Sequence, residues 1–128
     1  MGAHWTAWVT LAALGMYSWV LYMVGKARGK FGIFAPNCDG PVEFLSVLRV
    51  QANTVEQMVA FFPALWTCAV FDNDVFAASC GAVWVVARIM YARGYYQDPK
   101  KRSTGFLISS FTIMALILGT AYGLVMHG

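Results

Sequence analysis

No charged side chain occurs in the stretch AHWTAWVTLAALGMYSWVLYMV (residues 3–24), and this stretch decides the fold class. An α-helix needs about 20 apolar residues to cross the hydrocarbon core of a bilayer. A secretory signal peptide has a shorter apolar core, about 7–15 residues, after a basic start. Residues 3–24 have no basic start, so they predict a transmembrane helix.

The composition of the whole chain points to the same class. Of its 128 residues, 59% are hydrophobic and 12% are charged, whereas soluble domains have about 25% charged residues. A soluble domain of this size buries only about 60–70% of its unfolded surface, too little to hide so much apolar material. The high apolar content, with 4 Pro and 3 Cys, excludes a disordered chain, collagen and a disulfide scaffold. An integral membrane protein remains.

The gaps between charged residues predict three further spans, at about residues 48–71, 75–96 and 104–126. Together with residues 3–24, they predict an all-α fold, an integral membrane four-helix bundle that forms one domain over residues 1–128. The four spans use most of the chain and leave no second domain. Any chemistry must therefore be carried by the helices and their short connections.

Outside the spans, basic residues occur only in the two connections that share one side of a four-span protein. These residues are Lys26, Arg28, Lys30, Lys100, Lys101 and Arg102. The positive-inside rule then places the first and third connections in the cytoplasm and both termini outside. The short termini and the lack of a C-terminal retrieval signal favour a bacterial inner membrane over the endoplasmic reticulum.

Two polar stripes lie inside the predicted spans. Placing a charged side chain within a bilayer costs at least about 2.5–3.5 kcal/mol of free energy, so a charged residue there indicates a function. In the second span the stripe consists of Arg49, Asn53 and Glu56, and in the third span it consists of Arg88, Tyr91 and Tyr95. Both sets have helical spacing and lie near the cytoplasmic end of their span. Arginine binds carboxylates through two parallel hydrogen bonds, and glutamate can bind an amine. The stripes therefore suit a small anionic ligand that also has an ammonium group. The alternative is a set of buried ion pairs that only fix the helix register.

Several stretches carry a resemblance to a known family: VGKAR (24–28), GPVEF (40–44), RVQANTVE (49–56), RIMYARGY (88–95) and KRSTGF (101–106). In sequence and spacing they resemble the membrane-associated proteins in eicosanoid and glutathione metabolism, the MAPEG family. The last stretch is especially similar to microsomal glutathione transferases. The resemblance covers nearly the whole chain.

The resemblance implies a homotrimer in the lipid bilayer, with glutathione as co-substrate bound between subunits on the cytoplasmic side. The positions that match the family's glutathione site are Arg28, Arg49, Gln51, Asn53, Glu56, Arg88, Tyr91 and Tyr95. By the same resemblance, Arg102 is the catalytic residue that stabilises the glutathione thiolate. A free thiol has a pKa of about 8.5, which a nearby cation lowers. Arginine suits this role because it stays protonated in a partly apolar site.

The implied activity is that of a membrane-bound glutathione transferase acting in detoxification. Its thiolate would attack a lipophilic electrophile that enters from the lipid, and conjugation, epoxide opening and lipid hydroperoxide reduction all use this thiolate. Gln57 stands where several family members have Tyr, and Gly29 stands where leukotriene-C synthase has Arg. These departures favour a broad transferase or peroxidase over a specific eicosanoid synthase.

Two other functions remain open. A non-catalytic, lipid-binding adaptor of the same fold is one, although the family's adaptor lacks the arginines that stand here at Arg49 and Arg102. A small four-helix exporter is the other, although such exporters have an essential carboxylate in the first span. No metal site is expected, because His4 and His127 lie at opposite ends of the chain. Nucleic-acid binding has no support beyond a few lysines in the connections.

Overall fold

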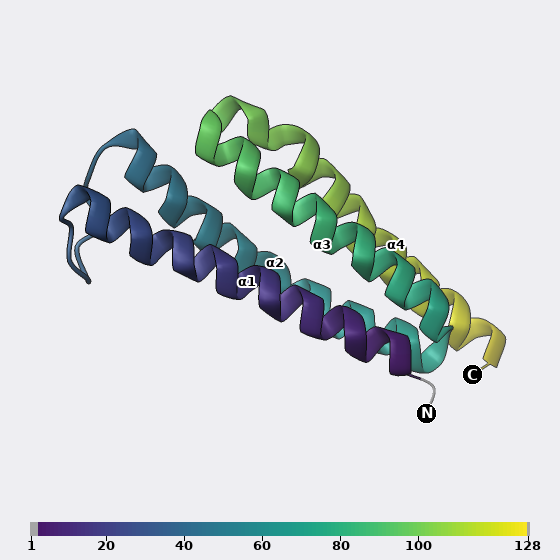
Figure 1. Cartoon of the computed structure of the whole chain (residues 1–128). Coiled ribbons are helices and arrows are strands. Elements are labelled where there is room, and N and C mark those ends of the chain that lie inside the picture. Colours follow the sequence, from purple (N-terminus) through teal and green to yellow (C-terminus); the bar gives the residue numbers. More distant parts are fainter. Residues whose placement is uncertain (1–2, 128) are drawn as a thin grey trace.

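The structure is a computed structural model and describes residues 3–127. Its elements, in chain order, are α1 (His4–Phe31), α2 (Val42–Phe71), α3 (Asp74–Gln97), the short 3-10 helix η1 (Pro99–Arg102) and α4 (Ser103–His127). The four long helices run antiparallel (Figure 1), with both ends of the chain and the α2–α3 turn at one end of the bundle. The other two connections lie at the opposite end. The predicted all-α, four-helix fold is confirmed.

Each long helix has the length and apolar composition needed to cross a membrane. Two of them extend beyond the predicted spans at the end that carries the basic connections. Helix α1 continues past Val24 to Phe31, and α2 begins at Val42. The difference arises because a charged residue ends an apolar stretch without ending a helix. Lys and Arg are good helix formers and interact favourably with the C-terminal end of α1.

Hydrogen bonds define the helix ends. Helix α1 ends at Gly32, which adopts a left-handed φ of 66° and donates its N–H to Arg28 O. At the opposite end of the bundle, the Asp74 carboxylate accepts hydrogen bonds from the backbone N–H groups of Trp5 and Thr6, at 3.0 and 2.9 Å. Asp74 is the first residue of α3, so a single carboxylate lies at the N-termini of two helices, where negative charge is stabilising.

Helix α3 packs against each of the other three long helices. On its α2 side, the Trp84 ring stacks on Phe61 with centroids 3.8 Å apart. On its α4 side the backbones come close at Gly105, where an added Cβ would lie 2.6 Å from Tyr91 N and 2.8 Å from Ala87 O. This close approach brings the start of α4 against the part of α3 that carries the predicted polar stripe.

We expect Gly105→Ala to lower the free energy of unfolding by about 1–3 kcal/mol, because the added methyl group must push α4 away from α3. Thermal unfolding of the purified protein in one detergent would measure the change. Gly15→Ala is the matched control, because nothing lies within 4 Å of a Cβ at that position of α1. Alanine is also the better helix former, so this control should be at least as stable as the wild type. Equal losses in both variants would contradict the close approach at Gly105.

Candidate active site

The polar stripes of α2 and α3 meet at Arg88, whose side chain is 0% exposed. Arg88 Nη2 donates hydrogen bonds to Asn53 Oδ1 at 2.8 Å and to Thr54 Oγ1 at 3.2 Å, both on α2. Arg88 Nη1 donates to Ser109 Oγ of α4 at 3.2 Å. Arg88 therefore joins three helices, and neutral oxygen atoms accept these hydrogen bonds.

A row of stacked side chains runs from Arg88 toward the basic end of the bundle. The Arg88 Cζ lies 4.1 Å from the centre of the Tyr91 ring. Tyr91 and Tyr95 meet edge to face with centroids 5.7 Å apart, and Arg102 Cζ lies 5.5 Å from the centre of the Tyr95 ring. Four of the predicted site residues thus follow one another in ring contact. Each cation–π contact contributes on the order of 0.5–2 kcal/mol.

A cavity of about 370 Å³ adjoins this row where α2, α3 and α4 meet. The side chains that line it are Asn53, Tyr91, Arg102, Ser103, Phe106 and Leu107. An amide, a phenol, a hydroxyl and a guanidinium form the polar part of the lining. Phe106 and Leu107 form the apolar part and are 39% and 51% exposed. A lining that joins several convergent polar groups to an apolar surface is consistent with a small-molecule site.

Two residues of the α2 stripe, Arg49 and Glu56, lie outside this cavity. Both side chains are exposed on the surface of α2. Within the described residues they form no ion pair with each other. A buried Arg49–Glu56 pair, the alternative interpretation of the stripe, is therefore wrong for the single chain.

Two further predicted site residues make contacts elsewhere. Arg28 Nη1 donates to Asn37 O at 2.8 Å and to Ile33 O at 3.3 Å, so it holds the first connection. Gln51 Nε2 donates to the Tyr17 hydroxyl of α1 at 3.1 Å. Neither residue lines the cavity of its own chain.

Sequence reasoning missed several residues of the site. Thr54 and Ser109 accept hydrogen bonds from Arg88, and Phe106 and Leu107 line the cavity. A signal existed for Ser109, because Ser109 and Ser110 are adjacent hydroxyls in a span without charges. Phe106 and Leu107 had no such signal, since apolar side chains are expected throughout a span.

Gln57, noted above for its departure from the family pattern, bridges three helices beside the site. Its Oε1 accepts a hydrogen bond from Trp84 Nε1 of α3 at 3.1 Å. Its Nε2 donates to Ser110 Oγ of α4 at 3.3 Å. Both ends of this amide are therefore engaged within the bundle.

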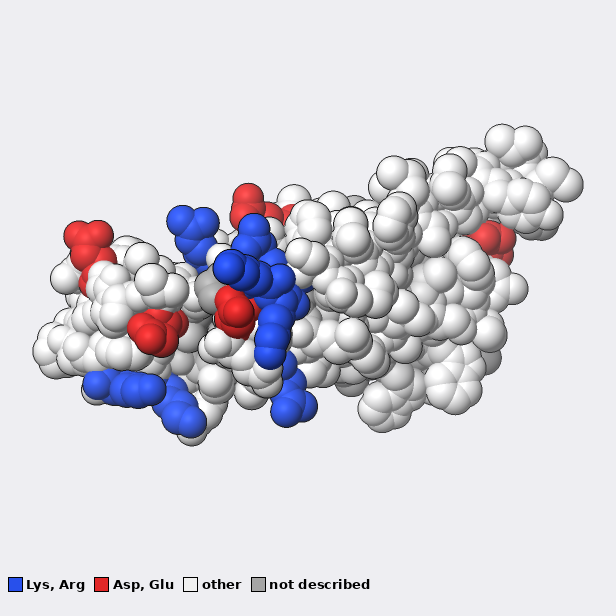
Figure 2. Space-filling view, turned by 90° about the horizontal axis from the view of Figure 1, so that it is seen from above, with Lys and Arg blue, Asp and Glu red and all other residues white. Residues whose placement is uncertain are grey.

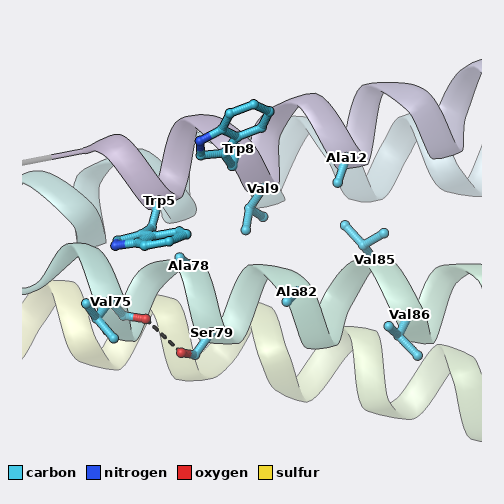
Figure 3. A pocket seen from close by; sticks show the side chains of 10 residues that line it. All are labelled: Trp5, Trp8, Val9, Ala12, Val75, Ala78, Ser79, Ala82, Val85 and Val86. Carbon is cyan, nitrogen blue, oxygen red and sulfur yellow. Dashed lines mark hydrogen bonds between the residues drawn. The ribbon is translucent and has the colours of Figure 1, made fainter.

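A larger hollow, about 530 Å³, lies between α1 and α3 near the opposite end of the bundle. Figure 3 shows its lining, which is apolar apart from the Ser79 hydroxyl and the two indole nitrogens. That hydroxyl donates to Val75 O of its own helix at 2.8 Å. With no charged side chain in its lining, this hollow lacks the groups that acid–base or nucleophilic chemistry needs.

The charge distribution separates the two ends of the molecule. On the face seen in Figure 2, Lys and Arg side chains gather over one half, with acidic side chains among them, and the other half is nearly uncharged apart from an acidic group near its end. Arg102 and the polar cavity belong to the charged half. Within the described residues, no group of three or more His, Cys, Asp or Glu side chains could hold a metal ion.

The four apolar helices define the class of the protein, an integral, multi-pass membrane protein. The chain belongs to the MAPEG family, whose model matches residues 6–122. The family predicted from the sequence is thereby confirmed.

Individual relatives cover most of the chain. It is 44% identical over 115 residues to the uncharacterized protein sll1147 of Synechocystis sp., covering 90% of this chain and 84% of that protein. It is 34% identical over 122 residues to microsomal glutathione S-transferase 2 of Bos taurus, covering 91% and 84% of the two chains. It is 32% identical over 121 residues to leukotriene C4 synthase of Mus musculus, covering 94% and 81%.

Proposed function

We propose that the protein is a membrane-bound glutathione transferase that binds glutathione as a thiolate and directs it at lipophilic electrophiles or lipid hydroperoxides. The observation that carries this proposal is the grouping of Asn53, Tyr91 and Arg102 around one cavity beside the buried Arg88. The names of the relatives, a glutathione S-transferase and a leukotriene C4 synthase, support it. No metal is proposed.

The cavity, together with the charged residues of the α2 stripe outside it, suits glutathione, which has two carboxylates, one ammonium group and one thiol. Guanidinium groups bind carboxylates through charge-assisted hydrogen bonds, which are about twice as strong as neutral ones. The residues proposed to bind glutathione, directly or through a neighbour, are Arg28, Arg49, Gln51, Asn53, Glu56, Arg88, Tyr91 and Tyr95. The Glu56 carboxylate is the acidic member of this set and would accept hydrogen bonds from the ammonium group.

Arg102 is proposed as the catalytic residue. Its guanidinium lines the cavity and lies over the Tyr95 ring, so it can approach the sulfur of a bound ligand. A fixed cation near sulfur favours the thiolate by about 1.36 kcal/mol for each unit by which it lowers the thiol pKa. In conjugation by substitution, the thiol proton passes to solvent, the thiolate forms a sulfur–carbon bond and the leaving group departs with its electron pair. In addition to an alkene or opening of an epoxide, the displaced electron pair remains on the product and takes up a proton from solvent.

The electrophile would enter from the lipid along α4. Phe106 and Leu107 line the cavity and are also exposed on the surface of this helix. An apolar molecule can therefore pass from the hydrocarbon phase to the cavity without crossing water. Such a route suits a lipophilic substrate, whose transfer into water is unfavourable.

In the test, purified wild-type protein should bind glutathione and develop the ultraviolet absorbance of a thiolate. Arg102→Ala should retain binding, lose the thiolate band and slow conjugation on the order of 10²-fold, because a fixed charge that stabilises the reacting anion is removed. Lys101→Ala is the matched control, since it removes a neighbouring charge that does not line the cavity. A panel of activated rings, alkenes, epoxides and hydroperoxides would separate transferase from peroxidase activity.

Two outcomes would contradict the proposal. Wild-type protein that binds glutathione but forms neither thiolate nor product would exclude the catalytic role. Protein that retains lipid but does not bind glutathione would instead be the non-catalytic adaptor.

We also propose that the chain assembles as a homotrimer, as the family resemblance implies. Glu56 lies halfway along α2 and is exposed on the single chain. A carboxylate at that depth is strongly disfavoured in contact with lipid, so another surface must cover it. A second copy supplies such a surface, and Arg28 and Gln51, which lie away from their own cavity, could then contribute to the cavity of a neighbour.

Native mass spectrometry in detergent should give an assembly with three times the chain mass of 14.1 kDa. Ala60→Trp should weaken this assembly, because Ala60 is exposed one turn beyond Glu56 on α2. Phe111→Trp, at an exposed position of α4, is the control and should leave the assembly intact. A monomer that conjugates glutathione at full rate would exclude the trimer.

The orientation can be tested with a native cysteine. Cys38 is exposed in the first connection, whereas Cys68 and Cys80 lie within helices and are less accessible. If that connection faces the cytoplasm of a bacterial inner membrane, a membrane-impermeant maleimide should label Cys38 in inside-out vesicles and not in spheroplasts. Cys38→Ser supplies the background signal, and labelling in spheroplasts would reverse the proposed topology.

A further inference from the structure

The strongest unexplained feature of the site is a cation without a counter-ion. Arg88 lies within a membrane-spanning helix and is 0% exposed. Within residues 3–127, no Asp or Glu forms an ion pair with it. Because burial of an uncompensated charge is costly, such a residue needs a function beyond helix packing.

Arg88 lies behind the cavity rather than in its lining. Two residues that line the cavity contact it, Asn53 through a hydrogen bond of 2.8 Å and Tyr91 through a ring contact of 4.1 Å. Its remaining hydrogen bonds go to Thr54 and Ser109, which do not line the cavity. Arg88 can therefore affect a bound molecule through Asn53 and Tyr91.

The contact with Arg88 fixes which end of the Asn53 amide is available to a ligand. A guanidinium has only donors, so the Asn53 atom that faces it must be the oxygen, Oδ1. The Asn53 amide has a second polar group, the Nδ2 amino group, which has two donors. Since Oδ1 is engaged by Arg88, Nδ2 is the group that Asn53 can offer to the cavity.

We propose that Arg88 is a positioning residue: it holds Asn53 Oδ1 so that Asn53 Nδ2 donates to a carboxylate or peptide carbonyl of the bound glutathione. The inference rests on the proposed function and adds a specific role to it. The Arg88 hydrogen bonds to Thr54 and Ser109 hold the guanidinium in place, and its contact with the Tyr91 ring holds that ring at the cavity. Arg88 itself does not touch the ligand.

A double-mutant cycle on the glutathione dissociation constant tests this role. Arg88→Lys keeps the charge but loses the planar set of donors, so it should weaken glutathione binding about tenfold. In an Asn53→Ala background, the same substitution should weaken binding by only about two- to threefold, because interacting residues are non-additive and the remaining effect passes through Tyr91. The turnover number at saturating glutathione should change much less than the KM for glutathione, since Arg102 is unaltered.

Asn53→Asp gives a second test that does not require an Arg88 variant to fold. The aspartate retains an oxygen for Arg88 and adds a counter-ion, so thermal stability should equal or exceed that of the wild type. It lacks Nδ2, so glutathione binding should weaken at least about tenfold. If Asn53 had only a structural role, glutathione binding would change together with thermal stability instead of weakening while stability is retained.

Thr112→Val is the control for loss of a buried polar group in this bundle. The Thr112 hydroxyl donates to Ile108 O of its own helix and does not contact Arg88, so the dissociation constant should not change. Equal weakening by Arg88→Lys in both backgrounds would overturn the positioning role, as would unchanged binding by Asn53→Asp. If the wild type does not bind glutathione, the proposed function is wrong, and so is this inference, which rests on it.

Discussion

The hydrogen bonds of Arg88 are the interaction on which the rest of the site depends. A guanidinium inside an apolar bundle cannot rely on water, so protein oxygen atoms must surround it. Asn53 and Thr54 of α2 and Ser109 of α4 supply these oxygens. Solvating one cation therefore fixes the positions of three helices relative to one another. The cavity forms where these three helices meet, so its shape depends on the same hydrogen bonds.

Two further hydrogen-bonded contacts join helices across the bundle in the same way. Trp66 Nε1 of α2 donates to Thr10 Oγ1 of α1 at 3.1 Å, and Asp74 of α3 accepts from the first turn of α1. Within a bilayer, unpaired polar groups are strongly disfavoured. Each pair therefore restricts how the helices can slide or rotate, while the apolar contacts around it are less specific. The few polar residues determine the register of the bundle.

The spacing of charges predicted the number of helices and their order, because lipid tolerates few charges along a span. Helical periodicity also predicted which residues share a face, as for Arg88, Tyr91 and Tyr95. Periodicity cannot predict which neighbour covers a face. Asn53 is therefore half-buried against Arg88, whereas Glu56 of the same stripe is exposed. The contacts of Arg28 and Gln51 depend on tertiary packing, and sequence spacing carries no information about it.

Gln57 illustrates how one substitution can change the role of a position without changing the fold. The family resemblance described above implies Tyr at this position, where a phenol would be available to glutathione. Here the Gln57 amide accepts from Trp84 and donates to Ser110. If Gln57 turned toward the cavity, Trp84 Nε1 would lose its partner, which costs about 1–3 kcal/mol for a buried donor. Gln57 is therefore held as a bridge in the bundle. Under the proposed function, recognition of glutathione therefore depends more on Asn53, Tyr91 and the arginines.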